Sequence, residues 1–140
     1  MEIIVFKKSS TKSLLANGSL TLKEYRCKCY SKFCTTTLVN TNTINAFRLT
    51  RGVFGGPIEI TSGYRCQFHN KKVGGISNSM HLIGSALDLR PAEKDFTAYE
   101  LDRLENLAKL YFDVVIRYEG FIHCHMLDSE DMDPYLDKEQ

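Results

Sequence analysis

The chain has 140 residues, of which 43% are hydrophobic and 25% charged, and its net charge is +1. This length suffices for one domain with a hydrophobic core, so we expect residues 1–140 to form a single domain. The near-neutral charge gives no electrostatic reason for a nucleic-acid partner, and no apolar run approaches the roughly 20 residues of a membrane span. We therefore expect neither nucleic acid nor membrane as a partner, and we expect a monomer.

The N-terminal segment before Thr21 is predicted to be loosely organised. In MEIIVFKKSSTKSLL the apolar run is short and the lysines follow it, which is the wrong order for a secretory signal. We expect a protein made and kept in a cytoplasm unless something else releases it. Thr21 and Glu24 fit a capping box, which predicts a short helix at residues 21–25.

Five cysteines are present: Cys27, Cys29, Cys34, Cys66 and Cys124. An odd number in a chain without a secretory signal argues against a disulfide framework. Three of them cluster in CKCYSKFC, where the spacing C-x-C-x4-C can supply part of a zinc or other thiolate site. Such a site needs a fourth ligand from elsewhere, so we favour small buried or half-exposed thiols over a structural metal.

The middle of the chain alternates between expected helix, strand and loop. Residues 35–53 place apolar side chains at roughly helical spacing, which predicts a helix that ends before Gly55. PIEITSGYR predicts a short strand. Residues 66–80, rich in Asn, Ser and Gly, predict a loop, and LIGSALDLR predicts a buried strand that ends at Pro91.

The C-terminal part contains the strongest helix pattern. Thr97 and Glu100 form a second capping box, and apolar residues at helical spacing predict a helix at 97–112. VVIRY and GFIHCHML predict two strands. The acidic tail, DSEDMDPYLDKEQ, is expected to be frayed.

Two histidines in GFIHCHML share one face of the expected strand. Side chains alternate along a strand, so Ile122, Cys124 and Met126 would pack on the core. His123 and His125 would then project side by side from the opposite face, about 7 Å apart at their Cα atoms. Two imidazoles placed in this way can lean toward one metal ion.

His81 and Asp88, within SNSMHLIGSALDLR, add two more donors. A catalytic zinc site takes imidazole nitrogen and carboxylate oxygen, with three protein ligands and one position left for water. His81 and Asp88 with one of His123 and His125 make such a set, whereas calcium and magnesium prefer oxygen shells. We expect an α+β domain in which a small antiparallel sheet carries a zinc site and helices flank the sheet.

Several segments resemble one known family. SNSMHLIGSALDLR matches the pattern S-x-H-x-x-G-x-A-x-D of the zinc D-Ala-D-Ala carboxypeptidase family, through Ser79, His81, Gly84, Ala86 and Asp88. ITSGYRCQFHNKKVGG and FIHCHM resemble the segments of that family before the histidine and around the last ligand, and TLKEYRCKCYSKFC is similar to the Cys-rich start of some small members. The family includes peptidoglycan peptidases and phage endolysins, and hedgehog zinc domains are related to it. The resemblance spans about residues 21–127 and is strongest to small bacteriophage members.

The resemblance implies a zinc-dependent peptidase that cleaves bonds next to D-amino acids in peptidoglycan stem peptides. Zinc would polarise a water molecule and the scissile carbonyl. Arg65 matches an arginine that binds substrate or stabilises an oxyanion, and Ser79 would hold substrate or shape its loop. The protein would be phage-encoded and act in host lysis, at the bacterial cell wall once released. A zinc-stabilised binding module without turnover is the alternative, because hedgehog domains keep the site without known peptidase use.

The late strand departs from the family pattern. Dipeptidase members carry a catalytic acid three residues before the last ligand, and this chain has none there for either histidine. An H-x-H pattern would make His125 the ligand, but F-I-H is the closer match and favours His123. The resemblance thus predicts His81, Asp88 and His123 as zinc ligands, with His125 or Glu119 as general base or transition-state stabiliser.

Overall fold

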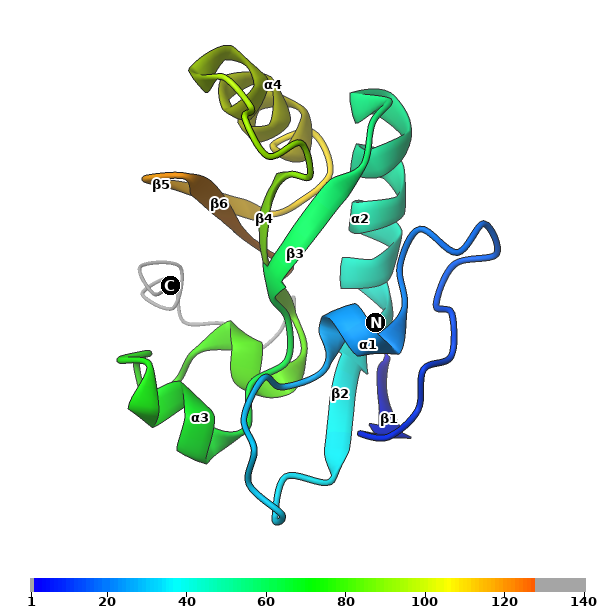
Figure 1. The fold of residues 1–140 in the computed structure, drawn as a ribbon, viewed down its shortest axis with the longest axis vertical. Helices are drawn as coiled ribbons and strands as arrows, with labels where there is room; N and C mark the ends of the chain where they lie inside the picture. Colours follow the sequence, from blue (N-terminus) through cyan, green and yellow to red (C-terminus); the bar gives the residue numbers. More distant parts are fainter. Residues whose placement is uncertain (1, 128–140) are drawn as a thin grey trace.

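A four-stranded antiparallel sheet, in the order β3-β4-β6-β5, forms the frame of the computed structural model, which describes residues 2–127 (Figure 1). Its strands are β3 (Ile58–Ser62), β4 (Ala86–Pro91), β5 (Val114–Tyr118) and β6 (Phe121–His125). Strand β4 lies inside the sheet, between β3 and β6. The predicted small antiparallel sheet and the α+β class are confirmed.

Helices α2 (Thr41–Phe54) and α4 (Ala98–Ala108) pack on the apolar face of this sheet (Figure 1). The core joins side chains of both helices to those of the central strands: Ala46, Phe47, Leu101, Leu104, Leu87, Leu89, Ile122 and Cys124. Helix α4 starts as predicted, because Thr97 Oγ1 accepts a hydrogen bond from the Glu100 N–H at 3.2 Å. The alternation predicted for residues 120–127 is confirmed, and it leaves His123 and His125 on the face away from the helices.

A second, two-stranded sheet was not predicted. Strand β1 (Ile3–Lys7) pairs antiparallel with β2 (Thr36–Asn40), where we expected loose structure and the start of a helix. The Thr-rich start of the expected helix contains several β-branched residues, which favour a strand. Helix α2 begins only at Thr41, because the Asn40 side chain accepts a hydrogen bond from the Asn42 N–H at 2.9 Å.

Other boundaries also differ from expectation. Helix α1 (Leu22–Tyr25) forms as predicted, but α3 (Gln67–Lys72) occupies part of the expected loop 66–80. A 3-10 turn, η1 (Met80–Ile83), takes the start of LIGSALDLR, so β4 is shorter than expected. The predicted frayed tail, residues 128–140, lies outside the described residues. Within residues 2–127, no helix is both long and apolar enough to cross a membrane.

Gly84 makes the turn from η1 into β4. Its φ of 72° lies in the left-handed region, and a Cβ atom added there would collide with the Leu38 carbonyl of β2. The Gly84 carbonyl accepts hydrogen bonds from the Tyr25 hydroxyl at 2.5 Å and from the Asn40 N–H at 3.1 Å. The turn that separates His81 from Asp88 is therefore held against α1 and β2.

Replacing Gly84 by alanine should destabilise the fold. The left-handed conformation costs an alanine about 1–2 kcal/mol, and the collision with Leu38 adds about 1–3 kcal/mol more. Gly55→Ala is the matched control, because Gly55 has a φ of 75° and no atom within 4 Å of an added Cβ. Urea unfolding of both variants measures the difference, and equal losses would show that the close approach to Leu38 carries no cost.

Candidate metal centre

The sheet brings two of the predicted ligands face to face. Asp88 of β4 and His123 of β6 are register partners, and His125 lies opposite Ala86 two pairs further along. Cross-strand partners project from the same face of a sheet, so Asp88 and both histidines share the face away from the core. His81 reaches the same point from η1, and its side chain is fully buried, as are those of His123 and His125.

The three donor atoms lie at spacings that suit a zinc ion. His81 Nε2 lies 3.2 Å from Asp88 Oδ1, and His123 Nδ1 lies 3.1 Å from the same oxygen. Neighbouring ligands of a tetrahedral zinc with bonds of about 2.0–2.1 Å lie roughly 3.3 Å apart. Two imidazole nitrogens and one carboxylate oxygen therefore fit a zinc ion with a small adjustment.

The outer contacts of the imidazoles direct their lone pairs to this point. His81 Nδ1 lies 2.7 Å from the Gly63 carbonyl, which only accepts, so Nδ1 carries the proton and the Nε2 of a neutral His81 presents its lone pair to Asp88. A lone pair facing a carboxylate oxygen calls for a cation between them. His123 Nε2 lies 2.7 Å from His125 Nδ1, and with the proton on Nε2 the Nδ1 of a neutral His123 presents its lone pair to Asp88. His125 thus lies behind His123 and orients its ring.

The charge state of the group follows from burial and contacts. Burial opposes ionisation of Asp88, but its contacts with His123 and His81 outweigh it and hold the pKa of Asp88 well below its usual value. Burial, reinforced by the neighbouring His123 and His81, lowers the pKa of His125 to about 3. At neutral pH the group therefore contains an ionised carboxylate and an uncharged His125, as a metal site requires.

Arg65 lies beside the carboxylate. Its Nη2 is 3.3 Å from Asp88 Oδ2, its Nε donates to Ser62 Oγ at 3.0 Å, and its Nη1 donates to Asn70 Oδ1 at 3.1 Å. Only 7% of Arg65 is exposed. Sequence reasoning found Arg65 but missed Ser62 and Asn70, which fix the plane of its guanidinium. Asn70 gave no signal in the sequence, because its role depends on α3 folding back toward Arg65.

The remaining predicted site residues fall in different places. Ser79 is buried, and its Oγ accepts a hydrogen bond from the His81 N–H at 3.2 Å, so it shapes the turn that carries His81. Glu119 lies in the exposed turn between β5 and β6, and the structure does not bring it to the metal group.

Comparison with protein families agrees with this geometry. Residues 19–125 match a family model described as Peptidase M15. This chain belongs to the peptidase M15 family. M15 peptidases are zinc-dependent metallopeptidases of the D-Ala-D-Ala carboxypeptidase type, and the His81, Asp88 and His123 group of this member suits the zinc ion that the family uses. No curated protein matches the chain.

The match also covers the cysteine segment after α1 and the whole sheet that carries the metal group. Helix α1 lies inside the matched region, whereas strand β1 precedes it. The M15 match therefore extends over the contacts that hold Arg65 and His81, as well as over the ligands themselves.

Zinc content of single variants should distinguish His123 from His125 in this M15 peptidase. His123→Ala removes a donor atom, so the variant should lose the ion, as should Asp88→Ala. His125→Ala removes only the group behind His123 and should keep one zinc ion at this centre, with affinity lower by about 10–100-fold. Zinc stoichiometry by elemental analysis, with a chelator titration for affinity, measures both effects. Loss of the ion from His125→Ala and its retention by His123→Ala would reverse the assignment.

Proposed function

We propose that this M15 peptidase hydrolyses peptide bonds next to D-amino acids in peptidoglycan stem peptides, with zinc held by His81, Asp88 and His123. The observation that carries the proposal is the convergence of two imidazole nitrogens on Asp88 Oδ1, with a buried arginine on the other carboxylate oxygen. When bound, zinc supplies Lewis acidity that polarises a water molecule and the scissile carbonyl.

Arg65 is proposed to bind the negative charge of the substrate. Ser62 and Asn70 hold the guanidinium beside Asp88, so little orientation remains to be fixed when an anion arrives. A planar guanidinium suits either the terminal carboxylate of a stem peptide or the oxyanion that develops during hydrolysis. The terminal carboxylate belongs to cleavage at the end of a peptide, whereas the oxyanion forms at any peptide bond that is cleaved.

His125 is proposed to stabilise the transition state. With Nδ1 accepting from His123 Nε2, the proton of His125 lies on Nε2, which is buried without a hydrogen-bond partner among residues 2–127. A buried N–H without a partner is costly, and a hydrogen bond to a substrate carbonyl oxygen would remove that cost. Glu119 carries no role in this proposal, because it lies in the exposed turn after β5.

A non-catalytic, zinc-stabilised binding module is the second candidate. It is favoured by Gly120, which stands three residues before His123 where dipeptidase relatives place an acid. We further propose that the protein is phage-encoded and acts in host lysis, which rests on its resemblance to small bacteriophage endolysins and on the peptidoglycan substrate proposed above.

Incubation with purified stem peptides, followed by mass spectrometry, separates the two candidates. A peptidase should cut the stem peptide into two shorter products, one that retains the terminal D-alanine and one that lacks it. A chelator should abolish these products until zinc is restored. Asp88→Ala is the matched inactive control. Binding of stem peptides with no new fragments from the zinc-loaded protein would favour the binding module and overturn the proposal.

Arg65→Lys should lower turnover of a stem peptide by about 10²–10³-fold, the cost of losing one oriented donor to a developing oxyanion. A lysine is a point charge and cannot replace the planar fork that Ser62 and Asn70 hold. Zinc should stay bound, because Arg65 donates none of the ligand atoms.

Arg90→Lys is the control for this substitution, since Arg90 lies on the same strand as Asp88 but forms an exposed pair with Glu59. Steady-state kinetics and zinc content of both variants provide the test. Unchanged kinetics in Arg65→Lys would assign Arg65 a structural role only.

A further inference from the structure

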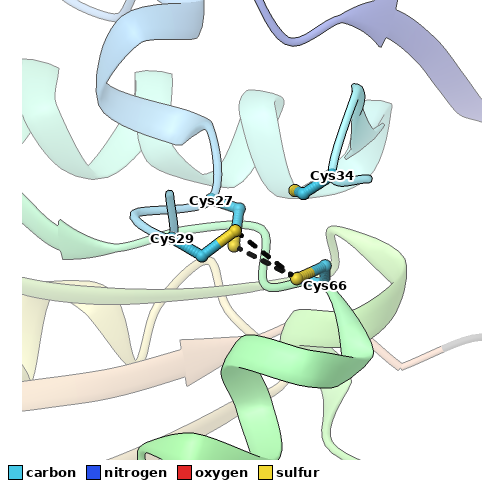
Figure 2. Close-up of side chains that lie close together, drawn as sticks. All are labelled: Cys27, Cys29, Cys34 and Cys66. Carbon is cyan, nitrogen blue, oxygen red and sulfur yellow. Dashed lines mark hydrogen bonds between the residues drawn. The ribbon is translucent and has the colours of Figure 1, made fainter. Parts of the chain in front are cut away.

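Four of the five cysteines converge on one point (Figure 2). They form a group separate from that of His81, Asp88 and His123. Three of them, Cys27, Cys29 and Cys34, lie in the loop after α1. The fourth, Cys66, is the residue that caps α3. Their sulfur atoms all lie within 4.8 Å of one another. The loop and the cap are separated in the sequence by β2, α2 and β3, so the fold has brought the fourth thiol to the other three.

The sulfur spacing fits a metal better than a disulfide. Cys66 Sγ lies 3.7 Å from both Cys27 Sγ and Cys29 Sγ. Neighbouring sulfurs of a tetrahedral zinc with Zn–S bonds of about 2.3 Å lie roughly 3.8 Å apart, whereas a disulfide brings two sulfurs to about 2.0 Å. All four thiols are free, and Cys66 is equally distant from two partners, which one disulfide cannot satisfy.

Donors around the cluster suit thiolates. The Cys66 N–H donates to Cys27 Sγ at 3.3 Å, and the His69 N–H donates to Cys66 Sγ at 3.4 Å. Lys8 Nζ donates to Cys29 Sγ at 3.4 Å and to the Cys29 carbonyl at 3.0 Å. Backbone N–H groups and a cation directed at sulfur offset the negative charge that four thiolates bring to one ion.

The loop that carries three of the cysteines has little apolar anchoring. Its large side chains, Tyr30 and Phe33, are 103% and 84% exposed. A segment that buries so little apolar surface needs another source of stability, and a structural metal is a common one. Sequence reasoning disfavoured a metal here because the fourth ligand was not evident. Cys66, which follows β3 in the sequence, supplies this fourth ligand.

We propose that Cys27, Cys29, Cys34 and Cys66 bind a second zinc ion. Four protein ligands close the coordination sphere, so this site is structural and distinct from the three-ligand centre at Asp88. The second ion would restrain the centre at Asp88 through the backbone, because its ligand Cys66 directly follows Arg65. The Tyr64 N–H also donates to the Tyr25 carbonyl at 2.7 Å, shortly before Cys27. The second ion thus fixes the stretch that carries Gly63 and Arg65.

Zinc counts on the full chain test this proposal independently of peptidase activity. Purified wild-type protein should contain two zinc ions per chain. Cys66→Ser and Asp88→Ala should each contain one, and the double variant none. Cys124→Ala is the matched thiol control and should retain two, because Cys124 packs in the core on the opposite face of β6. If Asp88→Ala lost an ion and Cys66→Ser did not, the four-thiol site would be refuted while the peptidase proposal stood.

Measurements on the unmodified chain keep the test valid if a variant fails to fold. Cobalt substitution of the wild type should give the thiolate-to-metal charge-transfer absorption of a tetrahedral sulfur site, and the four thiols should resist alkylation until a chelator is added. One zinc per chain with freely alkylated thiols would overturn the proposal. So would the mass of a disulfide-bonded chain, or iron in place of zinc at the four sulfurs.

Discussion

The arrangement of this M15 peptidase depends on one buried carboxylate. Asp88 lies on an interior strand, it is 5% exposed, and two imidazoles and a guanidinium surround it. Removing one partner from a buried charged group typically costs about 3–5 kcal/mol, so each partner must be delivered by a well-held element. Strand β6 delivers His123 by register, η1 delivers His81 through the Gly84 turn, and the residues after β3 deliver Arg65.

Local patterns predicted the parts of this site that lie within single segments. The alternation in GFIHCHML placed both histidines on one face, and an acid inside SALDLR required a partner, which the structure supplies. Both follow from strand geometry and the cost of burying charge. The capping boxes at Thr21 and Thr97 likewise marked helix starts, because the interactions that define them lie within one helical turn.

The features that were missed depend on contacts between distant segments. Strand β2 was predicted as helix because its partner, β1, lies near the N-terminus, beyond α1 and the cysteine loop, and gives no local signal. Helix α3 was predicted as loop, because Cys66 caps it with sulfur and not with the oxygen of a usual N-cap residue. The same residue completes the four-thiol cluster. Only the fold brings Cys66 to Cys27, and only the fold brings Asn70 to Arg65.

The two proposed zinc sites share one stretch of backbone. Gly63 accepts from His81, Arg65 contacts Asp88, and Cys66 joins the thiol cluster. A structural ion beside a catalytic one would therefore limit the movement of Arg65 and of the His81 ring, which is the preorganisation that oxyanion stabilisation needs. In this account the N-terminal cysteine loop supports the chemistry without contacting the substrate.

The most direct test of the account is a crystal structure of the zinc-loaded protein with anomalous data collected at the zinc absorption edge. The account predicts a strong anomalous peak bonded to His81 Nε2, a carboxylate oxygen of Asp88 and His123 Nδ1, with His125 outside bonding distance. A peak bonded to His125 instead of His123, or no peak at Asp88 in protein that cleaves stem peptides, would contradict it.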